Sequence, residues 1–162
     1  MIKPYRGAAI LFWKKVDGKV FVLLGKRTIK VGYGKWSTFG GGYNNDGSCL
    51  KNAEREASEE TNQGTDWEKF FGSEENKSCF HVNQKSIRHV RLPFYWYETY
   101  ACQVTGDEMD HAWWGNEDGT ANNTEVSEWK WFETTKLPKD TYILARWVVF
   151  DLLLRGRIKK GL

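Results

Sequence analysis

The sequence predicts an α/β fold, because strand patterns and helix patterns both occur along its 162 residues. Two short apolar runs, 5–13 and 20–24, flank Asp17-Gly18, a dipeptide that is typical of tight hairpin turns. Residues 48–62 place small apolar side chains at three- and four-residue steps, which predicts a helix with one narrow apolar stripe. We therefore expect two paired strands first and a helix after them.

The segments around this helix set its limits. Between the paired strands and the helix we expect a polar loop at 25–34 and a short extended piece at 36–39. Ser48 or Asp46 can cap the start of the helix, because a short polar side chain accepts hydrogen bonds from the first free main-chain N–H groups. Asn62 can end the helix, because asparagine tolerates a left-handed backbone.

Further strands and one more helix are predicted toward the C-terminus. Residues 79–84 and 92–104 have strand patterns, and the second is rich in aromatic and β-branched side chains. Residues 126–133 resume an extended pattern. The last helix is expected to start within 138–141 and to cover about 140–155. It is apolar around most of its circumference, so we expect it to be mostly buried.

Composition and charge limit the classes of function. The length, without an internal repeat or linker, favours one domain over residues 1–162. The net charge of +3 and the pI of about 8.7 suit an anionic ligand, but they are too weak to indicate a nucleic-acid-binding protein. Basic residues gather in a tail at 155–162. A frayed, solubilising terminus is the favoured interpretation, and an arm that contacts phosphate or RNA is the alternative.

Cysteine usage and hydropathy predict a cytoplasmic protein without membrane contact. Cys49, Cys79 and Cys102 form an odd count without a CxxC pair, which argues against a disulfide framework and against a structural zinc site. The first residues lack the apolar run of a signal peptide, and the most apolar segment, 143–154, is too short to span a bilayer. A reduced compartment is therefore expected.

The most informative feature is an acidic cluster on the predicted helix. Glu56, Glu59 and Glu60 are spaced i, i+3 and i+4, so they share one helix face. Like charges on one face repel unless a cation joins them, and hard divalent cations prefer carboxylate oxygens. A triple glycine at 40–42 lies upstream, where a backbone can approach a ligand closely. Taken alone, such a cluster is more often an ordinary solvated face, so the weight comes from the longer string that contains it.

That longer string, residues 40–63, resembles the Nudix box. It reads GGGYNNDGSCLKNAEREASEETNQ, and from 40 to 60 its glycines, its Arg-Glu pair and its Glu-Glu pair match that motif without a gap. The flanks are similar to the family's as well. Residues 23–27 resemble the second strand of that family, and residues 34–41 resemble the segment that leads into the box. Residues 125–138 resemble the family's late strand and the segment that follows it.

Three positions depart from the family's pattern. Gly47 stands where the box has its first Glu, Asn62 stands where it has its last Gly, and Gln63 replaces the apolar residue after that Gly. Asn62 is a mild change. Gly47 removes a carboxylate that helps to bind metal or to order the loop in many members, although Asp46 can substitute from the neighbouring position. This change bears on metal number and rate more than on the class of reaction.

The resemblance implies both a fold and an activity. The fold is an α/β/α sandwich with a mixed β-sheet between helices, and the box helix bears the site. The activity is hydrolysis of a diphosphate linkage in a nucleotide derivative, either a nucleoside triphosphate or a nucleoside diphosphate joined to another group. The products are a nucleoside monophosphate and a phosphorylated remainder. The implied cofactor is Mg²⁺, for which Mn²⁺ can substitute.

The resemblance also assigns roles to residues of the box. Glu56, Glu59 and Glu60 would bind the metal, with a main-chain carbonyl at Gly40 or its neighbour as a further ligand, and Glu59 is also expected to be catalytic. Arg55 would orient a glutamate by ion pairing. The metal would activate a water for in-line attack on phosphorus.

A general base is expected from outside the box. Glu125 fits by position, in the loop ahead of the late strand. Glu98, in the middle of a predicted strand, is its rival, although a strand-face charge that pairs with a nearby cation is the stronger interpretation there.

Substrate recognition is less specific in the sequence. Residues 105–124 form a long polar loop, and loops of that length are often functional. Trp113 and Trp114 in this loop can stack on a nucleobase or can pack the loop onto the body, with equal weight. The same two possibilities hold for Tyr33 and Trp36. Arg27 is a candidate for binding phosphate.

Two other functions remain open at this stage. A dinucleoside polyphosphate or the 5′ cap of an RNA could be the substrate, and RNA is only weakly supported, by the basic tail. The alternative from another class is a Nudix-like module that binds or senses a nucleotide without hydrolysing it. Gly47 motivates that alternative, whereas the retained cluster of Arg55, Glu56, Glu59 and Glu60 argues against it.

Overall fold

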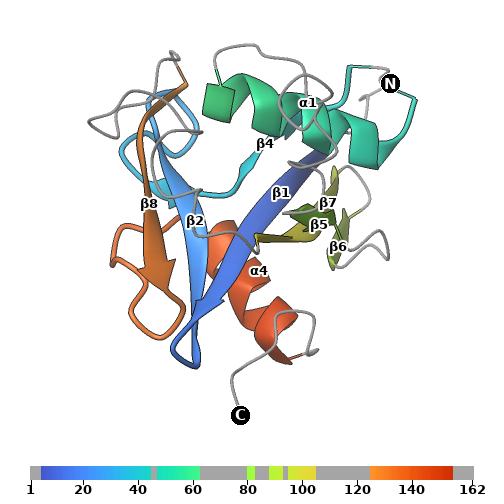
Figure 1. Ribbon diagram of the computed structural model, residues 1–162. Helices are drawn as coiled ribbons and strands as arrows, with labels where there is room; N and C mark the ends of the chain where they lie inside the picture. Colours follow the sequence, from blue (N-terminus) through green and yellow to red (C-terminus); the bar gives the residue numbers. More distant parts are fainter. Residues whose placement is uncertain are drawn as a thin grey trace.

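The computed structural model describes residues 5–44, 47–62, 80–82, 88–92, 95–104 and 125–154, and the structural statements below concern this part of the chain. Its centre is an eight-stranded β-sheet with strand order β3-β2-β1-β7-β5 along the main path. One helix covers each face of the sheet (Figure 1). The predicted α/β/α sandwich with a mixed sheet is confirmed.

The first two strands form the predicted hairpin. β1 (Tyr5–Val16) and β2 (Lys19–Arg27) pair antiparallel, with Val16 opposite Lys19. The turn between them uses Asp17 and Gly18, whose φ angles are 49° and 76°. Positive φ at both central residues gives the twist that joins two strands directly. β2 continues to Arg27, beyond the predicted end at 24, because Gly25 and Lys26 pair with further strands.

The sheet forks along one edge of β1. The second half of β1 pairs with β2, whereas Gly7–Ile10 pair with β4 (Phe39–Gly42). β3 (Trp36–Ser37) pairs with β2, so the short extended piece predicted at 36–39 proves to be two strands on separate branches. On its other edge β1 pairs in parallel with β7 (Tyr95–Val104). The fork leaves an opening beside β4.

The remaining strands complete the two edges. β5 (Phe80–Val82) and β6 (Arg88–Leu92) both pair antiparallel with β7. β6 was not predicted, and Leu92, which was expected to begin the long strand, ends β6 instead. β8 (Val126–Glu133) has the predicted bounds and pairs with β2.

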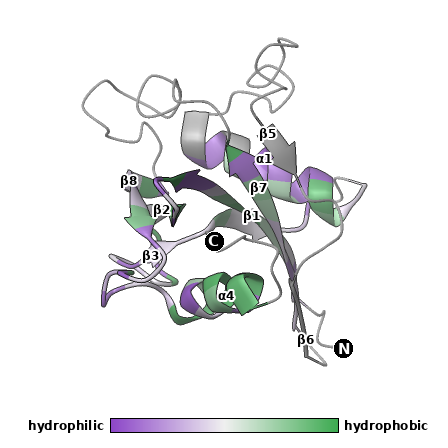
Figure 2. Ribbon diagram, turned by 60° about the horizontal axis from the view of Figure 1, so that its bottom comes forward, coloured by the Kyte–Doolittle hydropathy of each residue, from purple (hydrophilic) through white to green (hydrophobic). Residues whose placement is uncertain are grey.

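Each helix lies against one face of the sheet (Figure 2). α1 (Cys49–Asn62) packs Ala53 and Ala57 onto one face, and both side chains are fully buried. α4 (Ile143–Leu154) packs its apolar side chains onto the opposite face. The alternation of side chains along β1 supplies both cores, with Ala8, Ile10 and Phe12 toward α1, and Leu11 and Trp13 toward α4.

The expectation that the last helix is mostly buried is wrong for one of its sides. Its sheet-facing residues are buried, but Ile143, Trp147, Phe150 and Leu154 are 68%, 39%, 60% and 68% exposed. A single helix on one face of a sheet is covered on one side only, so an apolar circumference does not ensure burial. The helix also starts later than predicted, because Pro138–Tyr142 form a turn in which the Thr141 N–H bonds the Pro138 carbonyl at 3.1 Å.

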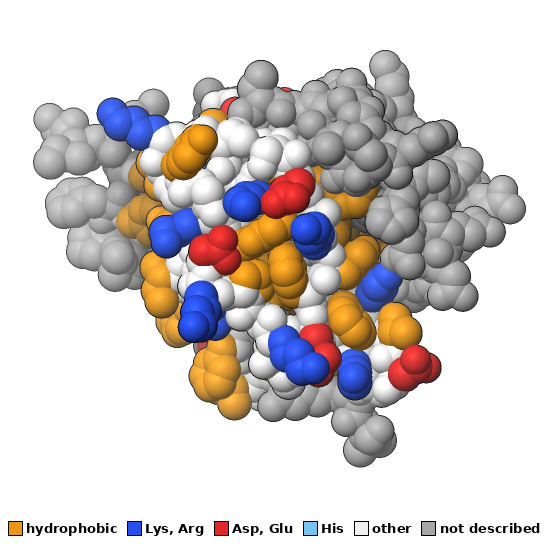
Figure 3. Space-filling view, turned by 90° about the vertical axis from the view of Figure 1, so that its left-hand side faces the viewer, with side chains coloured by type: hydrophobic (Ala, Val, Ile, Leu, Met, Phe, Trp, Pro, Cys, Tyr) orange, Lys and Arg blue, Asp and Glu red, His pale blue; other side chains and the backbone are white. Residues whose placement is uncertain are grey.

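Charged side chains cover the outer strand β8. Lys26 and Glu128 lie 3.4 Å apart, and Lys130 and Lys19 reach Glu128 and Glu133 at 3.8 Å. Figure 3 shows this side of the molecule, where basic and acidic side chains alternate around hydrophobic ones. Charges on an outer strand oppose pairing with another chain, so β8 can end the sheet here.

Two sequence predictions concern the surroundings of the protein. Among the described residues, Cys49 and Cys102 form no disulfide, and Cys79 lies outside the described residues. Neither described helix is long and apolar enough to cross a membrane. The long loop 105–124 and the basic tail 155–162 also lie outside the described residues.

Candidate active site at the fork of the sheet

Ser48 caps the helix that carries the acidic cluster. The Lys51 N–H donates to Ser48 Oγ at 3.2 Å, and the Asn52 N–H donates to the Ser48 carbonyl at 3.0 Å. Ser48 is therefore a cap of this helix, and Asp46, the other candidate, lies outside the described residues. Gly47 directly before it has a φ of 88°, a conformation that L side chains rarely adopt, and the space next to its Cα is open.

Arg55 ties the acidic cluster to the glycine strand. Its Nη1 donates to Glu59 Oε2 at 2.9 Å, and its Nη2 donates to Glu56 Oε1 at 2.6 Å. Nη2 also lies 3.1 Å from Asn52 Oδ1 and 3.4 Å from the Gly42 carbonyl. A planar guanidinium with several fixed donors suits this arrangement, because one cation holds two carboxylates and the strand at once.

Two glutamates of the helix are buried against the backbone of β4. The Gly40 N–H donates to Glu60 Oε2 at 2.8 Å, and Glu60 is only 3% exposed. Glu56 is 8% exposed, and a Cβ at Gly41 would lie 2.5 Å from its carboxyl carbon. Only glycine lets the carboxylate approach this strand so closely.

The environment of these glutamates disfavours negative charge. Burial raises the pKa of Glu60 well above its ordinary value, and the nearby Arg27 guanidinium and the Gly40 hydrogen bond oppose that rise. Burial also raises the pKa of Glu56, against the hydrogen bond and the charge of Arg55. The carboxylate of Glu125 raises the pKa of both groups. Three carboxylates thus repel one another at one place.

The oxygen chemistry of these side chains, and not their present arrangement, suits a hard divalent cation. Glu56, Glu60 and Glu125 offer carboxylate oxygens beside a glycine strand, and a cation between them would relieve their mutual repulsion. Among the described residues, no group of three His, Cys, Asp or Glu side chains already has a metal-binding arrangement. Glu59, the third glutamate of the helix cluster, forms an ion pair with Arg55 at 2.9 Å.

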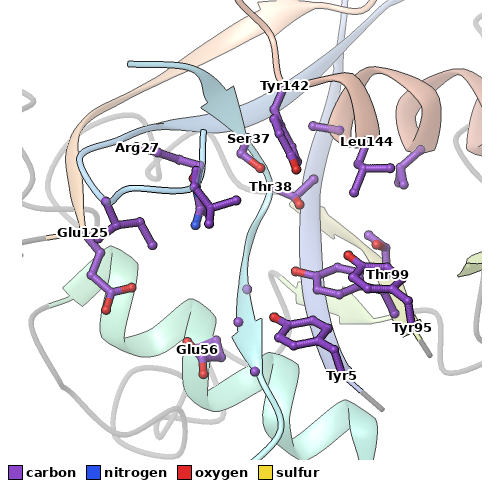
Figure 4. A pocket seen from close by; sticks show the side chains of 18 residues that line it. Tyr5, Arg27, Ser37, Thr38, Glu56, Tyr95, Thr99, Glu125, Tyr142 and Leu144 are labelled. Atoms are coloured by element: carbon purple, nitrogen blue, oxygen red, sulfur yellow. The ribbon is translucent and has the colours of Figure 1, made fainter. Parts of the chain in front are cut away.

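Glu56 and Glu125 border a cavity of about 540 Å³ at the fork of the sheet. Arg27 at the end of β2 and Glu125 ahead of β8 form one side (Figure 4), and residues 40–42 of β4 line the cavity as well. Tyr142 and Leu144, at the start of α4, close the top. A cavity of this volume is within the range of small-ligand sites.

Comparisons with known proteins identify the family. A family model described as the NUDIX domain matches residues 4–153. The chain belongs to the Nudix family. No curated protein matches the sequence.

Solved structures of other Nudix proteins share the fold at low identity. The chain is 15% identical to the Ap4A hydrolase of C. elegans in a binary complex, with a TM-score of 0.62, and the match covers 93% of this chain and 98% of that one. It is 18% identical to an ADP-ribose pyrophosphatase of Streptococcus suis, with a TM-score of 0.60, over 99% and 97% of the two chains. The NUDIX domain of Shewanella oneidensis NrtR, complexed with ADP ribose, is 15% identical, with a TM-score of 0.60, over 98% and 91%.

The structure brings together most of the residues that the sequence placed in the Nudix site. Arg27, Gly40, Glu56 and Glu125 line the cavity, and Glu60 bonds Gly40. Trp113 and Trp114 lie outside the described residues.

Tyr33 and Trp36 do not line the cavity. Tyr33 is 74% exposed, whereas Trp36 is 5% exposed and packs its ring edge-on against Phe132, with the ring centroids 4.8 Å apart. Packing is therefore what the structure shows for Trp36.

Glu98 lies on the other face of β7 from the cavity. It is buried at 7% exposure and accepts hydrogen bonds from Trp96 Nε1 at 3.1 Å and from the Tyr100 hydroxyl. Its partners thus include an indole and a phenol. Glu98 does not line the cavity, so its geometry gives it no access to a substrate bound there.

Sequence reasoning missed the tyrosines of the cavity. Tyr5, Tyr95, Tyr97 and Tyr142 all line it, although no motif contains them. They come from three segments far apart in the chain. One signal was present: residues 95, 97 and 99 alternate along a predicted strand, so they share one face.

Proposed function

We propose that this Nudix protein hydrolyses a diphosphate linkage in a nucleotide derivative, in a reaction that depends on a divalent cation. The observation that carries the proposal is the burial of Glu56 and Glu60 against the glycine strand, at one end of a cavity of ligand size. Buried carboxylates that repel one another are costly for a fold, so an arrangement of this kind indicates a functional demand for them.

The residues of the chain have distinct tasks in this proposal. Glu56, Glu59, Glu60 and the Gly40 carbonyl would hold Mg²⁺, for which Mn²⁺ can substitute. When bound, that cation neutralises the diphosphate and lowers the pKa of a water that attacks phosphorus. Arg55 positions Glu56 and Glu59 through its two ion pairs.

Two residues from outside the box would act on the substrate itself. Glu125 borders the cavity, and it would accept the proton of the attacking water. Arg27 borders the same cavity, and its guanidinium would bind a phosphate of the substrate next to the one that the water attacks.

The proposed substrate is a nucleoside diphosphate joined to another group, or a nucleoside triphosphate. Similarity to proteins named for Ap4A and ADP-ribose supports a nucleotide of this class. The product would be a nucleoside monophosphate with a phosphorylated remainder. Capped RNA is a variant, and deleting residues 155–162 tests it, because loss of salt-sensitive RNA binding would support that variant and unchanged RNA affinity would remove it.

The experiment that tests the proposal compares Glu60→Gln and Glu59→Gln with the native protein. We expect both variants to lose about a thousandfold or more of turnover on a panel of nucleotide diphosphates with Mg²⁺, because an amide cannot replace a carboxylate ligand of the cation. Circular dichroism and the thermal midpoint should remain near native, since the amide oxygen introduced by Glu60→Gln can still accept the Gly40 hydrogen bond.

Glu128→Gln is the matched control. Glu128 lies on β8 and pairs with Lys26 and Lys130, away from the cavity. It should keep native turnover. Near-native rates in both Glu59→Gln and Glu60→Gln would remove the assignment of these ligands.

A second candidate function is nucleotide binding without hydrolysis. Gly47 favours it, because the position of the first box glutamate lacks a carboxylate and adopts a backbone conformation that disfavours any side chain. Tight binding of a nucleotide with no phosphate release from any substrate on the panel would support this candidate. Turnover on any one of those substrates would exclude it.

A further inference from the structure

Three tyrosines form a stacked wall inside the cavity. The rings of Tyr5 and Tyr95 lie 5.3 Å apart between centroids with an interplanar angle of 14°, and those of Tyr95 and Tyr97 lie 6.1 Å apart at 11°. Parallel pairing of β1 with β7 sets Tyr5 opposite Tyr95, and Tyr97 is the next residue on the same face of β7. The sheet itself therefore fixes the wall.

This tyrosine wall lies across the cavity from the acidic residues. In Figure 4, Tyr5 and Tyr95 stand on the right of the glycine strand, whereas Glu56, Glu125 and Arg27 stand on the left. A bound nucleotide that placed its phosphates at the acidic end would thus present its sugar and base to the rings. This step rests on the proposed function.

The uncharged polar side chains that the structure describes around the cavity all carry the same group, a hydroxyl. Among the described residues that line it, every uncharged polar side chain carries a hydroxyl, and these are Tyr5, Ser37, Thr38, Tyr95, Tyr97, Thr99 and Tyr142. A hydroxyl both donates and accepts, and it rotates to suit its partner, whereas an amide or a guanidinium presents a fixed pattern. A tyrosine hydroxyl has an ordinary pKa near 10, so these groups keep their protons at neutral pH.

Arg27 brings a fixed array of hydrogen-bond donors to the cavity. Arg27 Nε donates to the Val31 carbonyl at 2.9 Å, and the positive charge of Arg27 lowers the pKa of Glu60. Its charge also lowers the pKa of Tyr5 and of Tyr97, so the guanidinium lies near the tyrosine wall as well as near the acidic end, where a phosphate of the nucleotide can occupy it.

We propose that the tyrosine wall holds the nucleobase by stacking at its open end, on the outer face of Tyr5, which is 46% exposed, and that the site accepts purine and pyrimidine nucleotides with little discrimination. Stacking needs only an aromatic face, which every base has. Strong discrimination needs buried groups that stay unpaired with the wrong base. Rotatable hydroxyls find a partner on any base edge, so they impose little penalty.

The first test measures binding of AMP, GMP, CMP and UMP by calorimetry with Mg²⁺ present, with ribose 5-phosphate as the probe that lacks a base. We expect the four dissociation constants to agree within about tenfold, and ribose 5-phosphate to bind at least about tenfold more weakly than any of them. A preference for one base above about a hundredfold would overturn the proposal, because it would reveal a fixed hydrogen-bond readout. Equal binding of ribose 5-phosphate would overturn it as well.

Ring variants assign the effect to the wall. Tyr5→Leu should weaken binding of all four nucleotides by about tenfold and leave ribose 5-phosphate unchanged, whereas Tyr5→Phe should stay within about threefold of native. Tyr95→Leu removes the ring that supports Tyr5 and should weaken the nucleotides in the same direction. Phe150→Leu is the matched control, since Phe150 is a 60% exposed aromatic on α4 that does not line the cavity. Unchanged affinity in both leucine variants, with a native thermal midpoint, would contradict the proposal.

Turnover separates this inference from the proposed function. The substrates are ADP-, GDP-, CDP- and UDP-glucose, which share one leaving group and differ only in the base. Hydrolysis of all four within about tenfold in kcat/KM supports both proposals. Binding of the monophosphates without hydrolysis of any substrate would contradict the proposed diphosphatase activity and would still support base stacking on the tyrosine wall. Hydrolysis of only one of the four substrates would contradict the proposed lack of base discrimination and would still support the diphosphatase activity.

Discussion

Gly41 occupies the closest approach between the glycine strand and the acidic helix. The position of its missing Cβ lies 2.5 Å from the Glu56 carboxyl carbon, so any side chain must displace that carboxylate. A displacement of about 1 Å at a reacting centre can cost on the order of 100-fold in rate. We therefore expect Gly41→Ala to lower kcat on a nucleotide diphosphate by that order, with a smaller change in KM.

Gly42→Ala provides the comparison for this variant. A Cβ at Gly42 would meet Tyr5 at 3.8 Å, an ordinary van der Waals distance, so the loss of kcat should be much smaller. Equal losses in the two alanine variants would mean that the strand as a whole is sensitive and that the Glu56 contact is not the cause.

Arg55 acts through the carboxylates that it holds. Lysine at this position keeps the charge but cannot bond Glu56 and Glu59 together with the Gly42 carbonyl. Arg55→Lys should therefore lower kcat by about 10- to 100-fold, the usual effect of losing a group that orients metal ligands.

Metal titration distinguishes positioning from a purely structural role for Arg55. The variant should need more Mg²⁺ for half-maximal activity, while its thermal midpoint stays near that of Lys51→Ala, a change at an exposed residue of the same helix. An unchanged Mg²⁺ requirement with a lowered thermal midpoint would contradict the positioning role.

At the level of the element, the start of α1 depends on one side chain. Ser48 Oγ accepts from the Lys51 N–H at 3.2 Å and so satisfies a donor of the first turn. Ser48→Ala should lower the free energy of unfolding by about 1 kcal/mol, as measured by urea denaturation. Turnover should stay near native, because Glu56 and Glu60 lie further along the helix and are fixed by Arg55 and Gly40.

Ser48→Asp tests whether the cap is the cause. Aspartate accepts the same hydrogen bond, so it should recover most of the lost stability. A full loss of stability in both variants would point to packing at position 48 instead of capping.

Local patterns in the sequence predict these elements well and the cavity poorly. The hairpin turn at Asp17-Gly18, the Ser48 cap of α1 and the bounds of β8 each depend on neighbouring residues, and each agrees with the structure. β6 depends on pairing with β7, which a single segment does not reveal. Tyr5 meets Tyr95 only because β1 and β7 pair in parallel, a contact between segments far apart in the chain.

The same contrast holds for the candidate site. The box predicts its acidic half, because Arg55, Glu56 and Glu60 lie within one helix whose spacing sets their common face. The tyrosine half has no such spacing. Trp36 was a candidate from its position near the box, yet it faces the core because β3 presents it to Phe132. The sequence does not reveal which face of the sheet a side chain of a two-residue strand points to.

At the scale of the whole molecule, the fork in the sheet connects stability with the site. The tyrosine wall lies where β1, β7 and α4 meet, so the rings that border the cavity also pack the fold. Burial, with the nearby hydroxyls of Tyr5 and Tyr142, raises the pKa of Tyr95 to about 12. Burial raises the pKa of Tyr97 and Tyr100 in the same direction.

These shifts predict a loss of stability at alkaline pH. Tyrosine in an unfolded chain titrates near pH 10, whereas Tyr95 in the folded protein keeps its proton until about pH 12. Between these values the unfolded state binds fewer protons, so the free energy of unfolding falls as pH rises. The contribution is complete below about pH 10 and is lost progressively toward pH 12.

Urea denaturation between about pH 9 and about pH 11.5 measures this dependence. Tyr95→Phe should lessen the fall, because phenylalanine has no proton to release in the unfolded state. Tyr33→Phe, at a side chain that is 74% exposed in the folded protein, should keep the native slope. If Tyr95→Phe declines as steeply as the native protein, the Tyr95 hydroxyl is open to solvent, and the stacked wall at the fork of the sheet does not form in solution.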